Sequence, residues 1–164
     1  MDYVNFIATQ TSAKVKVIKS DNGREFANSV STNFLEQKGI MHDRSAPYTL
    51  QSNGKIERHI RTIKDYARSM LNRFNSPQFL WAEAVNAAVY VWNRMLNQTS
   101  ETKTPFEQVF RRKPNLSHLK VFGCVAYAHI HEQFRNTFEC KSRKCVLVDL
   151  VGSSQNFRLY DPNL

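Results

Sequence analysis

The longest regular pattern in this sequence is an amphipathic stretch that runs from Gly54 to Phe74. Its apolar residues recur every three or four positions, as they do in a helix that buries one face: Ile56, Ile60, Ile63, Ala67, Met70 and Leu71. Asn75-Ser76-Pro77 ends this helix. Residues 78–96 are apolar on most sides, so we expect a second helix there that is largely buried. Its aromatic residues are expected in the core rather than in a binding stripe: Trp81, Tyr90 and Trp92.

Shorter elements precede the long helix. Apolar residues spaced by three and four predict helices, and alternating apolar and polar residues predict strands. The expected elements are a helix over 2–11, a strand from Lys14, a helix over 28–38 that stops at Gly39, a strand over 40–45 and a loop over 45–54. This alternation of helices and strands is typical of an α/β fold.

The character of the chain changes near residue 113. The residues that follow contain short β-like runs separated by polar or glycine-containing segments: LKVFGCVAYAHI, KCVLVDL and FRLYD. Just before this point, Thr104 followed by Pro105 indicates the start of a short helix. We therefore divide the chain into an α/β part, residues 1–112, and a small all-β part, residues 113–164.

The chain is strongly basic. Lys and Arg total 23 against 14 Asp and Glu, which gives a net charge of +9 and a pI near 9.7. This charge suggests a polyanionic partner such as nucleic acid, although many soluble proteins are basic without one. With no window of eighteen apolar residues and no visible secretory signal, we expect no membrane partner. We expect the nucleus and the cytoplasm as its location.

The three cysteines are odd in number and form no CxxC pair, which favours a reducing compartment. His129 and His131 precede Cys140 and Cys145, and these four residues could hold zinc. Their spacing is not one of the standard zinc patterns. Ordinary buried thiols next to strand residues are therefore the favoured interpretation.

Two carboxylates, Asp21 and Glu57, are candidates for a metal site. Asp21 follows a strand, Glu57 lies in the first turns of the basic helix, and 35 residues separate them. The two can converge if the helix packs across the end of the sheet. Paired carboxylates suit Mg²⁺, and two divalent ions can clamp the attacking and leaving oxygens of a phosphodiester. The alternative is that Asp21 only starts a turn and Glu57 forms an ion pair with Arg61.

The helix that carries Glu57 is also rich in cations. Its basic residues could follow a DNA backbone, in contacts that depend on salt and not on sequence: Lys55, Arg58, Arg61, Lys64 and Arg68. The alternative is a solvated helix face, which is usually charged because it contacts water.

Eight blocks of the sequence, in order, resemble the integrase region of Ty1/copia-type retrotransposon polyproteins. They are SDNGREF (20–26), SAPYTLQSNGKIER (45–58), ARSML (67–71), FLWAEAVNAAVYVWNR (79–94), TPFEQVF (104–110), KPNLSHLKVFGCVAYAHI (113–130), KCVLVDLVG (144–152) and FRLYDP (157–162). The resemblance covers nearly the whole chain. It implies the C-terminal part of a ribonuclease H-like integrase core, with an incomplete sheet and long helices, followed by a small SH3-like β module.

The resemblance also assigns residues. Asp21 matches the second Asp and Glu57 the Glu of the family's D,D-35-E triad, with Asn22 and Gly23 in the turn after Asp21. In the family these acids hold Mg²⁺ or Mn²⁺ for processing of DNA 3′ ends and for strand transfer. The residues around Glu57 match the loop before the catalytic helix and the start of that helix: Gln51, Asn53, Gly54 and Arg58. The nucleic-acid contacts expected from the helix and the resemblance together are Asn53, Lys55, Arg58, Arg61 and Lys64.

The first Asp of the triad is the main departure from the family pattern. The only earlier acid is Asp2, in a helix-like segment, and it is not assigned this role. We therefore expect a fragment truncated at its N-terminus that is inactive alone and does not necessarily bind the metal. The expected partners are element ends and target DNA, a second copy of the chain, or an intact integrase. The alternative function is a catalytically silent nucleic-acid-binding or assembly fragment from a degenerate element.

Overall fold

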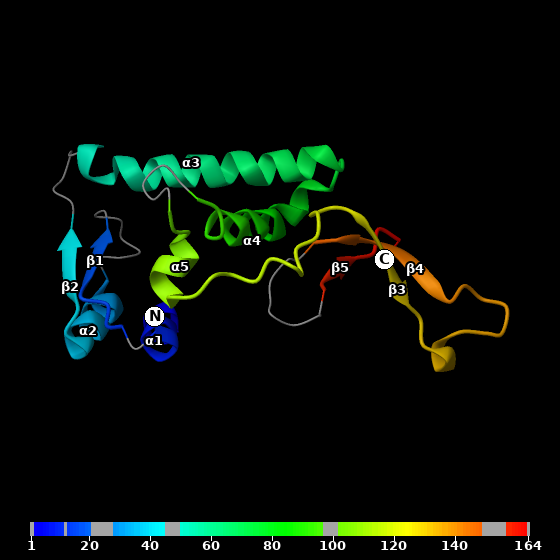
Figure 1. Ribbon diagram of the computed structural model, residues 1–164, viewed down its shortest axis with the longest axis horizontal. Coiled ribbons are helices and arrows are strands. Elements are labelled where there is room, and N and C mark those ends of the chain that lie inside the picture. The colour runs from blue at the N-terminus through cyan, green and yellow to red at the C-terminus, as the bar shows by residue number, and fades with distance from the viewer. Residues whose placement is uncertain are drawn as a thin grey trace. The chain divides into compact units, whose positions relative to one another are not determined.

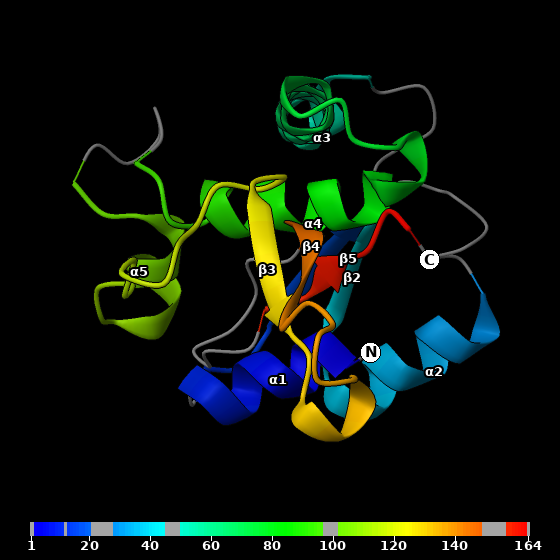
Figure 2. The ribbon, with the colours of Figure 1, turned by 90° about the vertical axis from the view of Figure 1, so that its right-hand side faces the viewer.

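The computed structural model describes residues 2–11, 13–20, 28–44, 50–96, 102–148 and 157–163. The chain divides into two compact units, residues 1–60 and 61–164 (Figures 1 and 2). The division falls inside the long helix, so that its first turns belong to the first unit. The boundary near residue 113 that the sequence suggested stays a prediction.

The first unit contains a pair of parallel strands. Its elements are α1 (Asp2–Thr11), β1 (Val17–Ser20), α2 (Ser29–Lys38), β2 (Met41–Arg44) and the beginning of α3 (Leu50–Arg73). Val17 pairs with Met41 and Ser20 with Arg44. Parallel strands need a crossover connection, and α2 lies in that connection. The helix over 2–11, the helix over 28–38 and the strand over 40–45 are confirmed to within a residue or two, while β1 is shorter than predicted.

Local capping explains the bounds of α2. The side chain of Asn28 accepts a hydrogen bond from the Ser31 N–H at 2.8 Å, which satisfies one of the free donors at the start of the helix. Gly39 ends the helix in the left-handed conformation, with φ of 64°, and its N–H bonds back to the last turn. Glycine adopts this conformation without steric cost, so the sequence signal at Gly39 is confirmed.

The long helix begins earlier than predicted. α3 spans Leu50–Arg73, so residues 50–54 are helical and the expectation that they lie in a loop is wrong. Gly54 costs a helix about 1 kcal/mol relative to alanine. No proline lies between Leu50 and Arg73, and the helix can extend across Gly54 because helix formation is cooperative over its 24 residues.

The second unit joins helices to an antiparallel sheet. Its helical elements after α3 are η1 (Gln78–Leu80), α4 (Trp81–Trp92), α5 (Pro105–Phe110) and η2 (Glu132–Phe134). The strands β3 (Val125–His129), β4 (Ser142–Leu147) and β5 (Leu159–Tyr160) follow the order β3-β4-β5. The short helix expected at Thr104 is confirmed, with a capping box in which Thr104 and Glu107 bond to each other's backbone.

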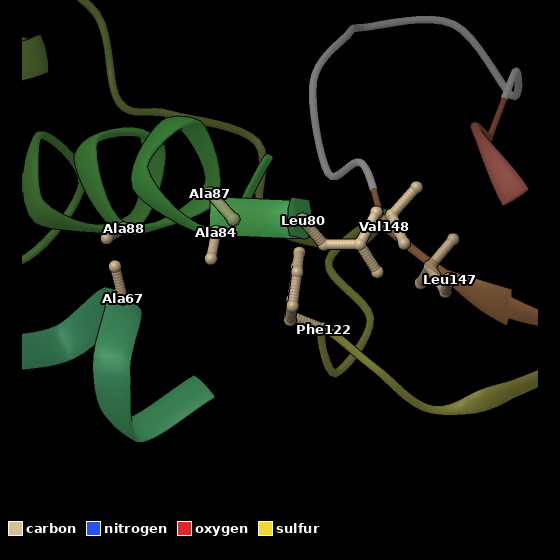
Figure 3. Close-up of a cluster of buried hydrophobic side chains, with 8 residues drawn as sticks. All are labelled: Ala67, Leu80, Ala84, Ala87, Ala88, Phe122, Leu147 and Val148. Atoms are coloured by element: carbon tan, nitrogen blue, oxygen red, sulfur yellow. The ribbon is translucent and has the colours of Figure 1, made fainter. Parts of the chain in front are cut away.

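One hydrophobic core serves both the helices and the sheet of this unit. Figure 3 shows Ala67 of α3 facing Ala88 of α4, and Leu80 beside Phe122 and Val148. The full set of buried residues is Ala67, Leu80, Ala84, Ala87, Ala88, Phe122, Leu147 and Val148. Alanines at the contact between α3 and α4 let the two helices approach closely. The β part therefore packs on the same core as the helices that precede it.

Two details of the second predicted helix are wrong. α4 ends at Trp92 and not at Leu96, and Trp81 is 63% exposed although it was expected in the core. At this end of α4 the core contains Leu80 and Phe122 and not Trp81. Tyr90 and Trp92 are half-buried and pack on neighbouring rings. Among the described helices, none has the length and apolar character needed to cross a bilayer.

Candidate nucleic-acid and metal site

Glu57 lies on the first turns of α3 and is exposed. Among the described residues its carboxylate forms no hydrogen bond or ion pair, so the alternative pairing with Arg61 is not formed. Asp21, the other predicted carboxylate, lies outside the described residues. The residue before it, Ser20, ends β1. In Figure 1 the arrowheads of β1 and β2 point toward the side of the first unit where α3 begins.

The predicted nucleic-acid contacts continue along α3. Arg58 is exposed, and its Nε donates a hydrogen bond to the Gly54 carbonyl at 3.0 Å. Arg61 and Lys64 are exposed further along the same helix. Asn53 and Lys55 lie in the helix, but their side chains are outside the described set. The structure therefore places Glu57, Arg58, Arg61 and Lys64 on one helix with exposed side chains. The side-chain positions of Asp21, Asn53 and Lys55 stay predictions.

A chain of side-chain hydrogen bonds crosses the C-terminal ends of β1 and β2. Ser20 Oγ lies 2.7 Å from His42 Nε2, and Arg44 Nε donates to His42 Nδ1 at 3.2 Å. Arg44 Nη2 continues to Thr32 Oγ1 of α2 at 3.4 Å. We call Ser20, His42 and Arg44 the strand-end relay. Of these three residues, Ser20 directly precedes Asp21 in the chain.

Sequence reasoning missed the strand-end relay. Ser20, His42 and Arg44 share one face of the parallel pair, because Ile18 pairs with His42, Ser20 pairs with Arg44, and every second residue of a strand lies on the same side. The only sign of this contact in the sequence is that polar residues stand at alternate positions near the strand ends. That signal could not identify partners, because it does not give the register between the two strands.

A divalent ion is the group that the two predicted carboxylates would hold. Within the residues that the structure describes, no group of three or more His, Cys, Asp or Glu is placed to hold a metal ion. The donor chemistry fits Mg²⁺, which takes one or two carboxylates and completes its shell with water and phosphate oxygens. Glu57 meets this requirement, since its carboxylate is exposed and engaged by no other described side chain.

The zinc alternative finds no support in the described part of the chain. Cys145 is buried on β4 opposite Ala126, whereas His129 at the end of β3 is opposite Ser142. Cys140 and His131 are exposed in the connection between the two strands. No metal-binding cluster forms from these residues. Cys145 thus matches the favoured interpretation of a buried thiol.

Arg94, two residues beyond the end of α4, packs between aromatic rings. Arg94 stacks on the Tyr90 ring at 3.4 Å and on the Phe106 ring at 4.8 Å, and its Nη1 donates to the Tyr90 carbonyl. Burial lowers the pKa of the Arg94 guanidinium. A cavity of about 410 Å³ borders this arginine and Arg158. Arg94 fixes α4 against α5 through these stacked rings.

Comparison with known proteins gives homologues among transposon polyproteins. The family described as "Retroviral polymerase SH3-like domain" matches residues 124–164. The Pol polyprotein of transposon TNT 1-94 of Nicotiana tabacum is 35% identical over 95% of this chain, and that of transposon RE2 of Arabidopsis thaliana is 32% identical over 89%. The chain spans only 12% and 10% of the lengths of these two relatives.

The fold is similar to that of one chain in a retroviral assembly. A chain of the simian T-cell lymphotropic virus intasome in complex with PP2A regulatory subunit B56 gamma matches 97% of this chain, and the match covers 59% of that chain. The TM-score is 0.52 at 16% identity, so this likeness concerns the fold alone. Together with the SH3-like match, it confirms the predicted fold class of an α/β integrase-type core followed by an SH3-like module. The homologues are Pol polyproteins of Ty1/copia-type and related plant transposons.

Proposed function

We propose that this chain, a homologue of Ty1/copia-type Pol polyproteins, carries part of the catalytic core of a retrotransposon integrase. In this proposal Asp21 and Glu57 are two of the carboxylates for metal-dependent DNA 3′-end processing and strand transfer. The observation that carries the proposal is the state of Glu57. Its carboxylate is exposed on a basic helix and forms no ion pair with any described residue. In the sequence, 35 residues separate it from Asp21.

The charge pattern of α3 supports this role. A carboxylate that stabilised the helix would pair with a cation one turn away, and such pairs are worth about 0.2–0.5 kcal/mol. Glu57 has Arg61 at that spacing and does not pair with it. A bound Mg²⁺ or Mn²⁺ would supply Lewis-acid polarisation of the phosphodiester and a lowered pKa for the attacking hydroxyl. Glu57 and Asp21 would hold that ion through carboxylate oxygens.

The cations of α3 supply the DNA-binding part of the proposal. Arg58, Arg61 and Lys64 are exposed and would contact backbone phosphates, with Asn53 and Lys55 at the start of the same helix. Contacts of this kind position a duplex without reading its sequence, and their strength falls steeply with salt. The proposed partners are therefore element ends and target DNA. Action on chromosomal DNA would place the protein in the nucleus.

Binding of Mn²⁺ to the purified chain tests the carboxylates directly. We expect Asp21→Asn and Glu57→Gln each to weaken Mn²⁺ binding, measured by electron paramagnetic resonance of the free ion, because each removes one charged ligand. Glu36→Gln is the matched control, since Glu36 is an exposed carboxylate of α2 in the same unit. Equal Mn²⁺ binding by the wild type and both site variants would contradict the proposal.

DNA assays separate catalysis from silent binding. We expect salt-sensitive binding to a duplex oligonucleotide that weakens in Arg58→Gln and Arg61→Gln. Strand transfer to target DNA is measured on the same oligonucleotide with Mg²⁺. DNA binding with neither Mn²⁺ binding nor strand transfer would favour the alternative, a catalytically silent nucleic-acid-binding or assembly fragment.

A further inference from the structure

Arg94 is a cation whose hydrogen-bond donors are only partly used. Its guanidinium stacks on the Tyr90 ring at 3.4 Å and on the Phe106 ring at 4.8 Å, and Nη1 donates to the Tyr90 carbonyl at 3.0 Å. Nε is buried and has no hydrogen-bond partner among the described residues. A guanidinium carries several N–H donors, and a buried donor without a partner costs free energy. Arg94 is therefore suited to bind a further acceptor, and an anion is the strongest acceptor for a cation.

The cavity of about 410 Å³ beside Arg94 is formed by one face of α4, by the residues at the end of this helix and by the β part of the second unit. Residues three or four apart lie on the same face of a helix. The lining residues that matter for binding are Glu83, Asn86, Val89, Asn93, Arg94 and Arg158. Pockets for small ligands and short peptide segments have volumes from about 300 Å³ upward. The cavity is therefore large enough for a side chain and its neighbouring backbone.

The charges around the cavity suit a single negative group. Arg94 and Arg158 are positive and Glu83 is negative, so the lining has a net charge of +1. Glu83 Oε1 lies 3.7 Å from Arg158 Nη1, so part of the Arg158 charge is balanced within the lining. Arg94 forms no ion pair in the described part of the chain. Burial lowers the pKa of the Arg94 guanidinium because it disfavours the charged form, and a bound anion would offset this cost.

We propose that this cavity binds the carboxylate of an aspartate or glutamate in an extended, acidic segment of a partner protein. Arg94 holds the carboxylate, because a planar guanidinium matches the geometry of two carboxylate oxygens. The exposed amides of Asn86 and Asn93 bond to the peptide backbone of the segment, since each amide can donate and accept. Val89 contacts an apolar neighbour of the acidic residue. This site is separate from the proposed metal site, because all of its residues belong to the second unit.

Nucleic acid is a poorer occupant of this cavity than an acidic peptide. A duplex carries one negative charge per about 1.7 Å of its axis, so several phosphates would approach Glu83 together with the phosphate that reached Arg94. The Arg94 guanidinium is half-buried between two rings, where a narrow side chain reaches it more easily than a sugar–phosphate backbone does. A peptide also offers backbone N–H groups that can donate to Glu83. The lining therefore favours a peptide.

NMR titration of the purified chain with peptides tests the proposal. The probe is a short capped peptide with one glutamate between two valines, and the matched probe has glutamine in place of the glutamate. We expect the glutamate peptide to shift the Arg94 Nε–H signal and the side-chain amide signals of Asn86 and Asn93 until they saturate. The glutamine peptide should bind at least about tenfold more weakly, because it lacks the charged hydrogen bond to Arg94.

Inorganic phosphate and a duplex oligonucleotide are titrated in the same way. Both should shift these three signals only at higher concentrations than the glutamate peptide does. Tighter binding of either one at these signals would overturn the proposal in favour of a phosphate site. A glutamate peptide that causes no saturable shift would overturn it as well.

Glu83→Gln is the most informative variant, because misfolding can abolish binding but does not strengthen it. The substitution removes the negative charge from the lining of the cavity. It should therefore strengthen binding of the glutamate peptide about fivefold and leave binding of the glutamine peptide unchanged. Unchanged or weaker binding of the glutamate peptide would contradict the proposal.

Arg94→Gln should weaken binding of the glutamate peptide at least about tenfold. The matched control is Arg112→Gln, since Arg112 also lies over the Phe106 ring, at 5.9 Å, but is not part of the cavity lining. It should bind the peptide as the wild type does, and hydrogen exchange of the α4 amides verifies that both variants are folded. Equal losses in the two variants would mean that general positive charge attracts the peptide, and the proposal would fail. It would also fail if Arg94→Gln lowered stability without changing peptide binding, because Arg94 would then only link α4 to α5.

Discussion

The two units of this chain differ in what stabilises them. The second unit has a core of eight buried residues, which come from α3, η1, α4, the end of β4 and the segments next to β3 and β4. In the described part of the first unit, Leu35 and Ile40 are the only buried apolar residues. The first unit instead relies on helix caps, a two-stranded parallel sheet and the strand-end relay.

This difference separates the best-packed residues of the chain from the site proposed above. Glu57 and the strand-end relay belong to the unit with the smaller described core, whereas the best-packed residues belong to the other. Regions with few buried apolar contacts open more readily than cores. Side-chain hydrogen bonds such as the one between Ser20 and His42 therefore restrain the strand ends of the first unit more than packing does.

The largest expected effect comes from Phe122, which is 3% exposed in the core of the second unit. Phe122→Ala should lower the free energy of unfolding of that unit by about 3–5 kcal/mol, because it deletes a ring and leaves a cavity. Urea unfolding monitored by amide hydrogen exchange measures this. Phe138→Ala is the control, since Phe138 is fully exposed and should change stability by less than about 0.5 kcal/mol.

The same exchange data test the separation of the two units. Amides of β1 and β2 should keep their protection in Phe122→Ala, because none of the buried residues that form the core with Phe122 comes from residues 1–60. Loss of protection in both units at the same urea concentration would break the comparison and show one cooperative body.

A smaller effect is expected at Gly123, where φ is +82° and an added Cβ would lie 2.6 Å from Phe74 Cδ2. Gly123→Ala should lower the free energy of unfolding of the second unit by about 1–3 kcal/mol, through overpacking and an unfavourable backbone conformation. Gly54→Ala is the matched change on α3. It has open space around its Cβ, so it should stabilise the helix by about 0.5–1 kcal/mol.

The sign of the Gly54 result also tests the start of α3. If residues 50–54 are helical, alanine replaces glycine inside a helix and adds stability. A destabilised Gly54→Ala variant would instead favour the loop that the sequence predicted. Thermal unfolding of the two glycine variants, compared with the wild type, decides between these outcomes.

The sequence predicted those features that depend on neighbouring residues. Asn28 and Gly39 bound α2 through contacts within four positions, and Thr104 caps α5 in the same way. Burial of Trp81 was predicted wrongly: this residue is exposed, and the core beside it includes Phe122, which is distant in the sequence. Local pattern cannot reveal which side chain fills a core from another element.

The candidate site shows the same limit. The spacing between Asp21 and Glu57, together with the family resemblance, identified the two carboxylates as candidates. The bond between Ser20 and His42 was not predictable, since a shift of one residue between parallel strands would place His42 on the other face. Register is a property of the folded sheet. The contact between Ser20 and His42 therefore had to come from the structure.

The smallest effect is expected at Lys19, whose ion pair with Asp43 lies on the opposite face of β1 from the strand-end relay. Lys19→Gln should change the free energy of unfolding of the first unit by less than about 0.5 kcal/mol, and the difference should vanish at high salt. Hydrogen exchange of the β1 amides at low and high salt measures it. A larger loss that disappears at high salt would mean that surface charge, and not the strand-end relay, holds the two strands together.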